Sequence, residues 1–289
     1  MIHRFSFIEK IILRFDIFPH PLVDAFLNVI AGRALQVAVA MGIVDVLEGE
    51  ERVTLKEIQH RTGADREGLR AVLEVLVGLH YVEKRGDAYR LSRRGRKFFH
   101  RASGTALRSV ILFAERIFQD FQHLEESIRS GKTVKELETY DAGEWRIFFG
   151  AMVDLARLQA KEVVRKIPFA KTHKIVLDVG GMHGLYAMES CRRVDGMRAE
   201  IVDLPAVQRM AEDLIRNEQM EGRVRFIARN FLTEPFTGMY DVVFLFSVIH
   251  GLTPAVNEAL VKNIHGHVRP GGMVVVMDQF TDFGNNSDL

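Results

Sequence analysis

The spacing of apolar positions changes character near residue 168. Before that point, apolar residues recur every three or four positions, which is typical of amphipathic helices. After it, short apolar runs of strand length alternate with helix-like stretches. The runs lie at 174–179, 199–202, 223–228, 240–246 and 273–277, and the helical stretches at 184–193, 206–218 and 254–268. This alternation predicts an α/β fold with a doubly wound, mostly parallel sheet.

The first hundred residues predict a separate helical domain. An amphipathic helix over residues 1–30 is expected to break at Pro19-His20-Pro21, and the next helix to run to Gly49. A capping box at Thr54–Glu57 opens a further helix, and another begins at Asp65. Two alternating runs joined by Arg85-Gly86-Asp87 then predict a hairpin. Three helices followed by a hairpin indicate a winged-helix-like domain.

These patterns divide the chain into three segments. Residues 1–100 form the helical, winged-helix-like domain, and residues 101–168 form a helical linker that contains many aromatic side chains. Residues 169–289 form the α/β domain. Few residues follow the last predicted strand, so we expect either that the sequence is cut short or that this strand is an exposed edge of the sheet.

Composition limits the partners and the compartment that we expect for this protein. Apolar residues make up 47% of the chain, and 39 Lys and Arg residues nearly balance 38 Asp and Glu residues, so no overall field recruits nucleic acid or an anionic membrane. Cys191 is the only cysteine, which excludes an intramolecular disulfide and favours a reducing cytoplasm. Charges interrupt the first 18 residues, and the apolar run 34–47 is too short to cross a bilayer. We therefore expect no membrane partner.

The most informative stretch is Asp178-Val-Gly-Gly-Met-His-Gly184, where an apolar strand meets glycines and then a helix. Ligands bind at the carboxyl ends of such strands, and glycine lets a ligand approach the backbone. The order differs from the dinucleotide fingerprint G-x-G-x-x-G, and the phosphate-binding pattern G-x-x-x-x-G-K-[ST] does not occur. The next strand ends in Asp203, which can accept hydrogen bonds from ribose hydroxyls. A nucleoside without phosphates is expected, and S-adenosylmethionine fits; the alternative is a tight turn and an ordinary helix-opening aspartate.

With these residues in place, residues 30–280 resemble the S-adenosylmethionine-dependent O-methyltransferases of the caffeic-acid and hydroxyindole type. Five motifs carry the resemblance, in the family's order. They are Asp178-Val-Gly-Gly-Met-His-Gly184, Asp203-Leu204-Pro205, Arg229-Asn230-Phe231-Leu232, Ile249-His250-Gly251-Leu252, and Pro270-Gly271-Gly272 through Asp278. The resemblance implies S-adenosyl-L-methionine as cofactor, a small-molecule methyl acceptor, a homodimer formed by the N-terminal domain, and no metal.

The resemblance also assigns roles to individual residues. Gly180, Gly181 and Gly184 would face the methionine part of the cofactor, Asp203 would hold the ribose, and Asn230 and Phe231 would meet the adenine, with Asp178, Leu204 and Ser247 also at the cofactor. His250 would be the general base and Asp278 its acidic neighbour. Phe149 and Met152 would contact the acceptor; the alternative for each is packing in the core.

The chemistry agrees with these roles. Methyl transfer from a sulfonium needs an aligned oxygen nucleophile and the removal of one proton. Histidine, which titrates near neutral pH, suits that proton transfer. His250 follows an apolar strand and Asp278 ends the next one, so both are expected at one edge of the sheet. The alternative for His250 is a plain loop histidine.

Four features depart from the family pattern. Met182 stands in place of a glycine, Asn230 in place of an aspartate, and Gly251-Leu252 in place of Asp-Trp. The chain also ends at Leu289, where family members continue through two further strands. These departures leave open a non-catalytic cofactor-binding or regulatory homologue.

A winged-helix DNA-binding regulator is the third hypothesis, because basic residues gather after the hairpin. They are Arg90, Arg93, Arg94, Arg96, Lys97 and Arg101. The helix that would enter a DNA groove carries mixed charge, however, including Asp65, Glu67 and Glu74. We therefore expect the N-terminal domain to pair with a second copy and not to bind nucleic acid.

Overall fold

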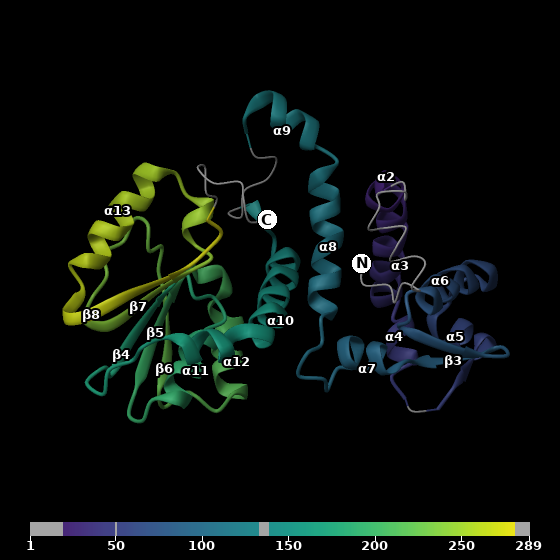
Figure 1. The fold of residues 1–289 in the computed structure, drawn as a ribbon, viewed down its shortest axis with the longest axis horizontal. Coiled ribbons are helices and arrows are strands. Elements are labelled where there is room, and N and C mark those ends of the chain that lie inside the picture. Colours follow the sequence, from purple (N-terminus) through teal and green to yellow (C-terminus); the bar gives the residue numbers. More distant parts are fainter. Residues whose placement is uncertain (1–19, 50, 133–138, 281–289) are drawn as a thin grey trace. The chain divides into compact units, whose positions relative to one another are not determined.

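The protein is described from a computed structural model, which defines residues 20–49, 51–132 and 139–280 (Figure 1). The chain divides into two compact units, Met1–Thr139 and Tyr140–Leu289. The segment that the sequence suggested as a linker is thus shared: its first helices belong to the first unit and its long last helix to the second. Each unit is described by itself below.

The first unit opens with one continuous helical stretch. It consists of α2 (His20–Leu22), the π-helical turn η1 (Val23–Leu27) and α3 (Asn28–Ala40). The expected break at Pro19-His20-Pro21 falls partly outside the described ranges, because Pro19 and the residues before it are not described; from His20 onward the chain is helical. The helix does not continue to Gly49. It ends at Ala40, and Gly42, with a φ of 70°, starts the short helix α4 (Ile43–Val46).

By length and composition, the stretch His20–Ala40 could also cross a membrane, and 22% of it is buried within the protein. The sequence pattern pointed only to the shorter apolar run 34–47 and did not predict this longer stretch. One such helix near a chain start is weak evidence for a membrane span. Exposed apolar side chains do lie along it, including Leu22, Phe26 and Ile30.

The rest of the first unit contains the expected helices and hairpin. The elements are β1 (Val53–Thr54), α5 (Leu55–Thr62), α6 (Arg66–Gly78), β2 (Val82–Arg85), β3 (Ala88–Leu91), α7 (Arg93–Phe99), α8 (Arg108–Phe121) and α9 (Leu124–Ser130). Thr54 and Asp65 cap α5 and α6 by accepting hydrogen bonds from backbone amides, as their positions predicted. The strand β1, which was not predicted, pairs with β3, so the sheet order is β1-β3-β2.

The second unit is the predicted doubly wound α/β fold. Its elements are α10 (Ala142–Lys166), β4 (Ile175–Val179), α11 (Leu185–Arg193), β5 (Arg198–Asp203), η3 (Pro205–Val207), α12 (Gln208–Asn217), β6 (Val224–Ala228), β7 (Tyr240–Phe246), η4 (Ile249–Gly251), α13 (Pro254–His265) and β8 (Val268–Met277). The described strands are all parallel and lie in the order β6-β5-β4-β7-β8. The chain order therefore reverses between β4 and β7, where such folds bind ligands.

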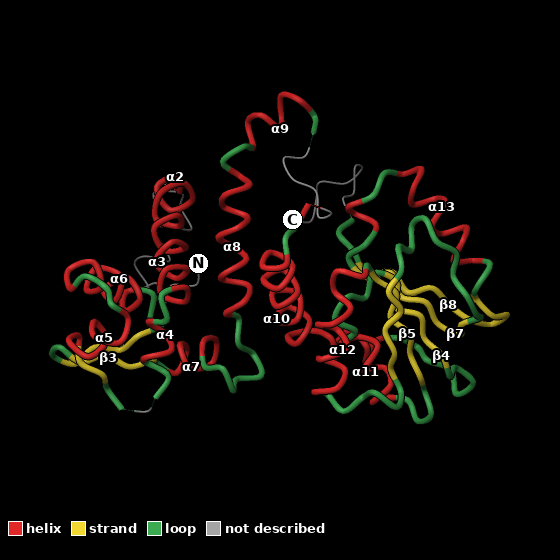
Figure 2. Tube along the Cα trace, turned by 180° about the vertical axis from the view of Figure 1, so that it is seen from behind, coloured by secondary structure: helices red, strands yellow, loops and turns green. Residues whose placement is uncertain are grey.

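Helices cover the two faces of this sheet unequally. On one face, α10, α11 and α12 bury a large core that includes Trp145, Met188 and Ile201. On the other face, α13 contributes Leu260 and Ile264 to a smaller core over β4 and β7 (Figure 2). The two apolar faces explain why the sequences of β4 and β7 are almost continuously apolar.

The Pro-Gly-Gly segment lies inside β8 and not before it. Tyr240 pairs with Val268 and Val242 with Met273, so the intervening residues form a bulge. A Cβ on Gly272 would lie 2.7 Å from the carbonyl oxygen of Asp241, which explains the need for glycine there. β8 is the edge of the described sheet, and the prediction about strands beyond it concerns residues outside the described ranges.

Candidate functional site

The predicted site residues gather at one edge of the second unit's sheet. Asp178 lies at the end of β4, Asp203 at the end of β5, and Asn230 just after β6. His250 follows β7, and Asp278 follows β8. Because the strands are parallel, these five strand ends lie side by side, and the site is assembled across the whole sheet.

The glycine turn between β4 and α11 is pressed tightly against its neighbours. A Cβ on Gly180 would lie 2.8 Å from Val248 and 3.4 Å from the ring of Phe231. A Cβ on Gly184 would lie 2.1 Å from Ile201, and Gly184 has a φ of 66°, which disfavours any other residue. Met182, in the place of the family's third glycine, also has a positive φ of 40°.

Asp178 is the most unusual group at this edge. Its side chain is 1% exposed, and neither carboxylate oxygen has a hydrogen-bond partner among the described residues. A Cβ on Gly181 would lie 2.4 Å from this carboxyl group, so the turn closes directly over it. Burial, and then the neighbouring carboxylate of Asp203, raise the pKa of Asp178 to about 8. The amide of Ala187, which lies near but makes no hydrogen bond of full geometry, opposes the shift.

Asp203 is held by the backbone of the same turn. One of its oxygens accepts a hydrogen bond from the amide of Met182 at 2.8 Å, and the other from the amide of Leu204 at 2.7 Å. Burial raises the pKa of Asp203 to about 6, although these two amides oppose the shift. The glycine turn and the end of β5 are thus tied together through one carboxylate.

The two buried carboxylates and the glycine turn fit the predicted cofactor. S-adenosylmethionine carries a cationic amino group, a sulfonium and ribose hydroxyls, all of which favour nearby carboxylates. A buried carboxylate without a partner is costly unless a ligand satisfies it. Asp178, Asp203 and the glycines are therefore the residues able to hold such a group.

The remaining cofactor candidates occupy the ends of β6 and β7. The Asn230 side chain accepts a hydrogen bond from the Leu232 amide at 3.0 Å, and the ring of Phe231 lies against Gly180. Ser247 is exposed, has a φ of 56°, and donates its amide to Met277. Leu204 packs against the larger core.

His250 and Asp278 are in direct contact, as their strand ends suggested. His250 lies in the 3₁₀ turn η4 with its side chain 45% exposed, and its Nδ1 is 2.7 Å from a carboxylate oxygen of the fully buried Asp278. Burial alone would raise the pKa of Asp278, but hydrogen bonds from the Gln279 amide, His250 and the Ile249 amide hold it below its ordinary value. Asp278 therefore stays ionised at neutral pH and orients the imidazole.

The two acceptor candidates lie on α10. Phe149 is buried in the larger core of the second unit, which agrees with the packing alternative, and Met152 is half-buried. Their contact with an acceptor stays a prediction.

Other histidines have structural surroundings. His183, in the glycine turn, is buried and accepts a hydrogen bond from the Leu185 amide, and burial lowers its pKa to about 4. Over the described ranges, no three or more His, Cys, Asp or Glu side chains gather in a way that could hold a metal ion.

The sequence did not predict the role of Val248, whose methyl group would lie only 2.8 Å from a Cβ on Gly180. Met182 stood out only as a departure, and the sequence did not predict that its amide binds Asp203. Neither contact has a signal in the sequence, because each joins residues from different strands.

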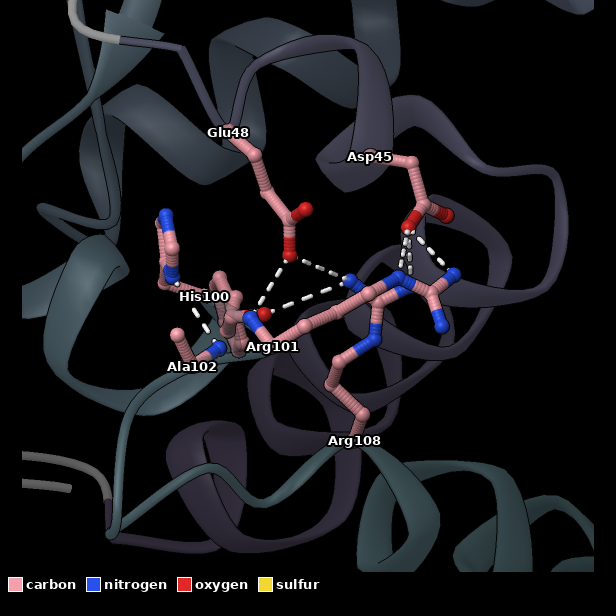
Figure 3. A network of polar contacts seen from close by, with 7 residues as sticks. Asp45, Glu48, His100, Arg101, Ala102 and Arg108 are labelled. Carbon is pink, nitrogen blue, oxygen red and sulfur yellow. Dashed lines mark hydrogen bonds and ion pairs between the residues drawn. The ribbon is translucent and has the colours of Figure 1, made fainter.

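The basic residues after the hairpin are largely used within the first unit. Arg90 binds Glu83, and Arg94 and Arg96 donate to backbone carbonyls. Arg101 binds Asp45 at 2.6 Å, next to Arg108, which binds Asp45 and Glu48 (Figure 3). These contacts hold the guanidinium groups against the protein and disfavour the DNA-binding hypothesis.

Comparisons with known proteins extend this description. A family profile described as an O-methyltransferase domain matches residues 115–289. A second profile, described as an O-methyltransferase dimerisation domain, matches residues 23–101. The two matches cover most of both units.

Two characterised relatives are similar over most of the chain. The N,N-dimethyltransferase OxyT of Streptomyces rimosus is 26% identical over 261 residues, which cover 86% of this chain and 75% of OxyT. The tetracenomycin polyketide synthesis 8-O-methyl transferase TcmO of Streptomyces glaucescens is 26% identical over 272 residues, which cover 91% of this chain and 79% of TcmO.

A solved structure has the same fold. The crystal structure of human N-acetylserotonin methyltransferase in complex with S-adenosylmethionine superposes with a TM-score of 0.77. The match covers 96% of this chain and 81% of the human one at 20% identity, which supports similarity of fold alone.

Proposed function

Because this chain belongs to the O-methyltransferase family, we propose that it transfers the methyl group of S-adenosyl-L-methionine to a hydroxyl group of a small aromatic acceptor. The alternative of a non-catalytic cofactor-binding homologue lacks support, because the relatives that it matches are named methyltransferases. The observation that carries the proposal is the His250–Asp278 pair at the same sheet edge as the glycine turn and its two buried carboxylates.

The chain's own residues divide the work between binding and proton removal. When bound, S-adenosylmethionine supplies an electrophilic methyl group on a sulfonium. Asp203 accepts hydrogen bonds from the ribose hydroxyls, the glycine turn accommodates the methionine part, and Asn230 and Phe231 border the adenine. Asp178, whose pKa of about 8 leaves it mostly protonated at neutral pH, would ionise beneath the turn when a cationic ligand lowers that pKa, which favours a cationic ligand over a neutral one.

His250 removes the proton from the acceptor hydroxyl. Its Nδ1–H donates to Asp278, which leaves the Nε2 lone pair free to accept a proton. The ionised Asp278 then stabilises the imidazolium that forms, as a buried partner of opposite charge does. Phe149 and Met152 provide apolar surface for a flat acceptor.

We propose that the first unit pairs with a second copy of the chain through a winged-helix-like arrangement. The dimerisation profile covers residues 23–101, which include most of the apolar helix that starts at His20. The exposed Phe26 and Ile30 on that helix would be covered by the partner. A soluble cytoplasmic dimer is therefore the proposed form.

The experiment that tests the function has two stages. Calorimetry with S-adenosylmethionine measures cofactor binding by the full chain. Turnover is then assayed by mass spectrometry with 3-amino-4-hydroxybenzoate, N-acetylserotonin and 1-naphthol as probes. The first probe carries both an amine and a hydroxyl group, so NMR of its product distinguishes O- from N-methylation. Absence of cofactor binding would contradict the proposal, and cofactor binding without methylation of any phenol would favour the non-catalytic alternative.

The role of His250 predicts the effect of His250→Gln. Loss of a general base is expected to reduce turnover by about 100- to 10,000-fold, with the affinity for S-adenosylmethionine unchanged. Kinetics on whichever probe is methylated, with calorimetry alongside, measure both. His265→Gln, on the exposed end of α13, is the control and should retain wild-type rates. Full turnover by His250→Gln would remove the histidine from the mechanism.

A further inference from the structure

The turn that carries His250 is held by apolar side chains and by its backbone. The apolar side chains that pack against the smaller core are those of Val248, Ile249 and Leu252. The turn follows Ser247, whose φ of 56° is unfavourable for a residue with a side chain. A Cβ on Gly251 would meet no atom within 4 Å, so the turn is not packed at that position. The apolar packing fixes the position of the turn, and the groups that bind its amides and carbonyls add control over the direction of the imidazole.

Asp278 binds the amide side of the turn. One of its oxygens accepts hydrogen bonds from the amides of Val248 at 2.9 Å and Ile249 at 2.8 Å, and lies 3.4 Å from the amide of His250. Its other oxygen binds the imidazole at 2.7 Å. One buried carboxylate thus fixes both the ring and one side of its backbone.

Asn257 binds the carbonyl side of the same turn. Its Nδ2 donates to the carbonyl oxygen of Ile249 at 2.9 Å and lies 3.5 Å from that of Leu252. Asn257 stands one turn into α13, which Thr253 caps and which Leu260 anchors in the smaller core. The amide therefore links the turn to a helix that is anchored in the core.

The carbonyl oxygen of the Asn257 side chain is unusual for a residue with a purely structural role. Its Oδ1 is buried and has no hydrogen-bond partner in the part of the chain that the structure describes. An unsatisfied buried acceptor lowers stability, and an apolar side chain would avoid it. What this position gains from asparagine is the Nδ2 donor, and that donor is used on the two carbonyls that flank His250.

We propose that Asn257 is a positioning residue for His250. It holds the carbonyl side of the turn while Asp278 holds the amide side, and together they fix the direction in which Nε2 faces the acceptor. The proposal rests on the proposed function, in which His250 is the base. Neither the family resemblance nor the sequence pattern assigns a role to Asn257.

The test uses the full chain with S-adenosylhomocysteine bound and with histidine labelled by ¹³C and ¹⁵N. Asn257→Leu and Asn257→Ala remove the donor, and Asn263→Leu is the control on the same helix. His250→Gln assigns the His250 signal. In the wild type, the ring is expected to be protonated at Nδ1 and to occupy a single state. In both Asn257 variants we expect the Nε2–H tautomer to appear, and in Asn263→Leu we expect the wild-type spectrum.

Hydrogen exchange and kinetics complete the test. Amides 248–252 should exchange about ten-fold faster in the Asn257 variants, while those of the rest of α13 keep wild-type rates. On a methylated probe, kcat should fall by about 10- to 100-fold, because a misdirected base loses alignment, with KM for the cofactor unchanged. A wild-type tautomer and wild-type exchange in both variants would overturn the proposal. The tautomer and exchange data need no turnover, so they remain decisive even if His250→Gln shows that His250 is not the base.

Discussion

At the scale of single residues, the site is defined by two buried carboxylates that lie close enough to raise each other's energy. Asp178 has no hydrogen-bond partner among the described residues, whereas Asp203 accepts two backbone hydrogen bonds. Burial raises the pKa of both, to about 8 for Asp178 and about 6 for Asp203. Such a strained pair is a cost to folding that a cationic ligand relieves, and strongly shifted groups of this kind gather at functional sites.

The raised pKa of Asp178 makes stability depend on pH. Its folded pKa of about 8 exceeds its unfolded value of 3.8, so the folded protein binds more protons between these values and loses stability as pH rises through this window. Asp178→Asn removes this loss. We expect it to raise the Tm at pH 8 by at least about 2 °C, with the gain shrinking towards pH 4.

The same variant should bind S-adenosylmethionine more weakly, because its amide cannot ionise in response to a cationic ligand as the carboxyl of Asp178 can. Thermal unfolding between pH 4 and 8 and calorimetry measure the two effects. Asp195→Asn, at an exposed position, is the control. A Tm difference that does not change with pH would show that Asp178 is not protonated in the folded protein.

At the scale of elements, the turn between β4 and α11 has no room for side chains at its three glycines, Gly180, Gly181 and Gly184. Gly184 combines a left-handed backbone with a gap that Ile201 already fills. This close approach brings the start of α11 onto β5 and places the turn's amides beside Asp203. The geometry of the turn is therefore as necessary to the site as the side chains that line it.

The turn predicts a large effect for Gly184→Ala. A left-handed alanine and a methyl group 2.1 Å from Ile201 should together cost about 2–4 kcal/mol and abolish detectable cofactor binding. Gly222→Ala is the control, because a Cβ there meets no atom within 4 Å and its φ is not positive. Urea unfolding and calorimetry compare the two. Equal stability of the two variants would contradict the close contact.

In the first unit, Arg108 at the start of α8 joins Asp45 on α4 to Glu48 (Figure 3). Its side chain is 14% exposed, so water competes weakly for these ion pairs. Burial acts to raise the pKa of Asp45, but the hydrogen bonds from Arg101 and Arg108 outweigh it and lower that pKa. The ion pairs of Arg101 and Arg108 thus connect α4 to the segment that leads into α8.

Arg108→Gln should therefore lower the free energy of unfolding of the chain by about 1–3 kcal/mol at pH 7. Because the folded pKa of Asp45 lies below its unfolded value of 3.8, the ion pairs stabilise the fold above that value. The effect of the substitution should therefore fade as the pH falls below about 4. Arg129→Gln, which breaks an exposed pair with Glu125, should cost only about 0–1 kcal/mol. Urea titrations of both variants provide the comparison, and similar losses would contradict the importance of the network.

At the scale of the whole molecule, the two units match two family profiles, one catalytic and one for dimerisation. The second unit contains every predicted cofactor and catalytic residue. The first unit uses its basic residues for internal contacts and leaves apolar side chains of its first helix exposed. These features favour association between copies of the chain over binding to nucleic acid.

The expected particle is a dimer of twice the 32.9 kDa chain. Sedimentation equilibrium measures its mass, and Phe26→Glu should shift it towards the monomer by placing charge on the apolar helix. Phe280→Glu, at a still more exposed aromatic position in the other unit, should leave it unchanged. A mobility assay with duplex DNA should show no shift at moderate salt. A monomeric wild type, or a salt-dependent DNA shift, would contradict this assignment.

The sequence by itself determined the fold of the second unit and the residues of its edge. Alternating apolar runs located the five strands because strand burial follows from local pattern, with bounds that moved by one or two residues except in β8. The glycines, Asp203, His250 and Asp278 were predicted because they stand at strand ends, and parallel strands bring such ends together.

Only the tertiary structure decided how these groups interact. The absence of a partner for Asp178, the bond from Met182 to Asp203 and the two bonds from Asn257 join residues that no local pattern connects. The bulge in β8 likewise depends on how that strand pairs with β7. The helix that includes Pro21 depends on where the proline lies within it. Local spacing fixes which face of an element is buried, but contacts between elements are set by packing over long sequence distances. The chemistry of this edge depends on those contacts.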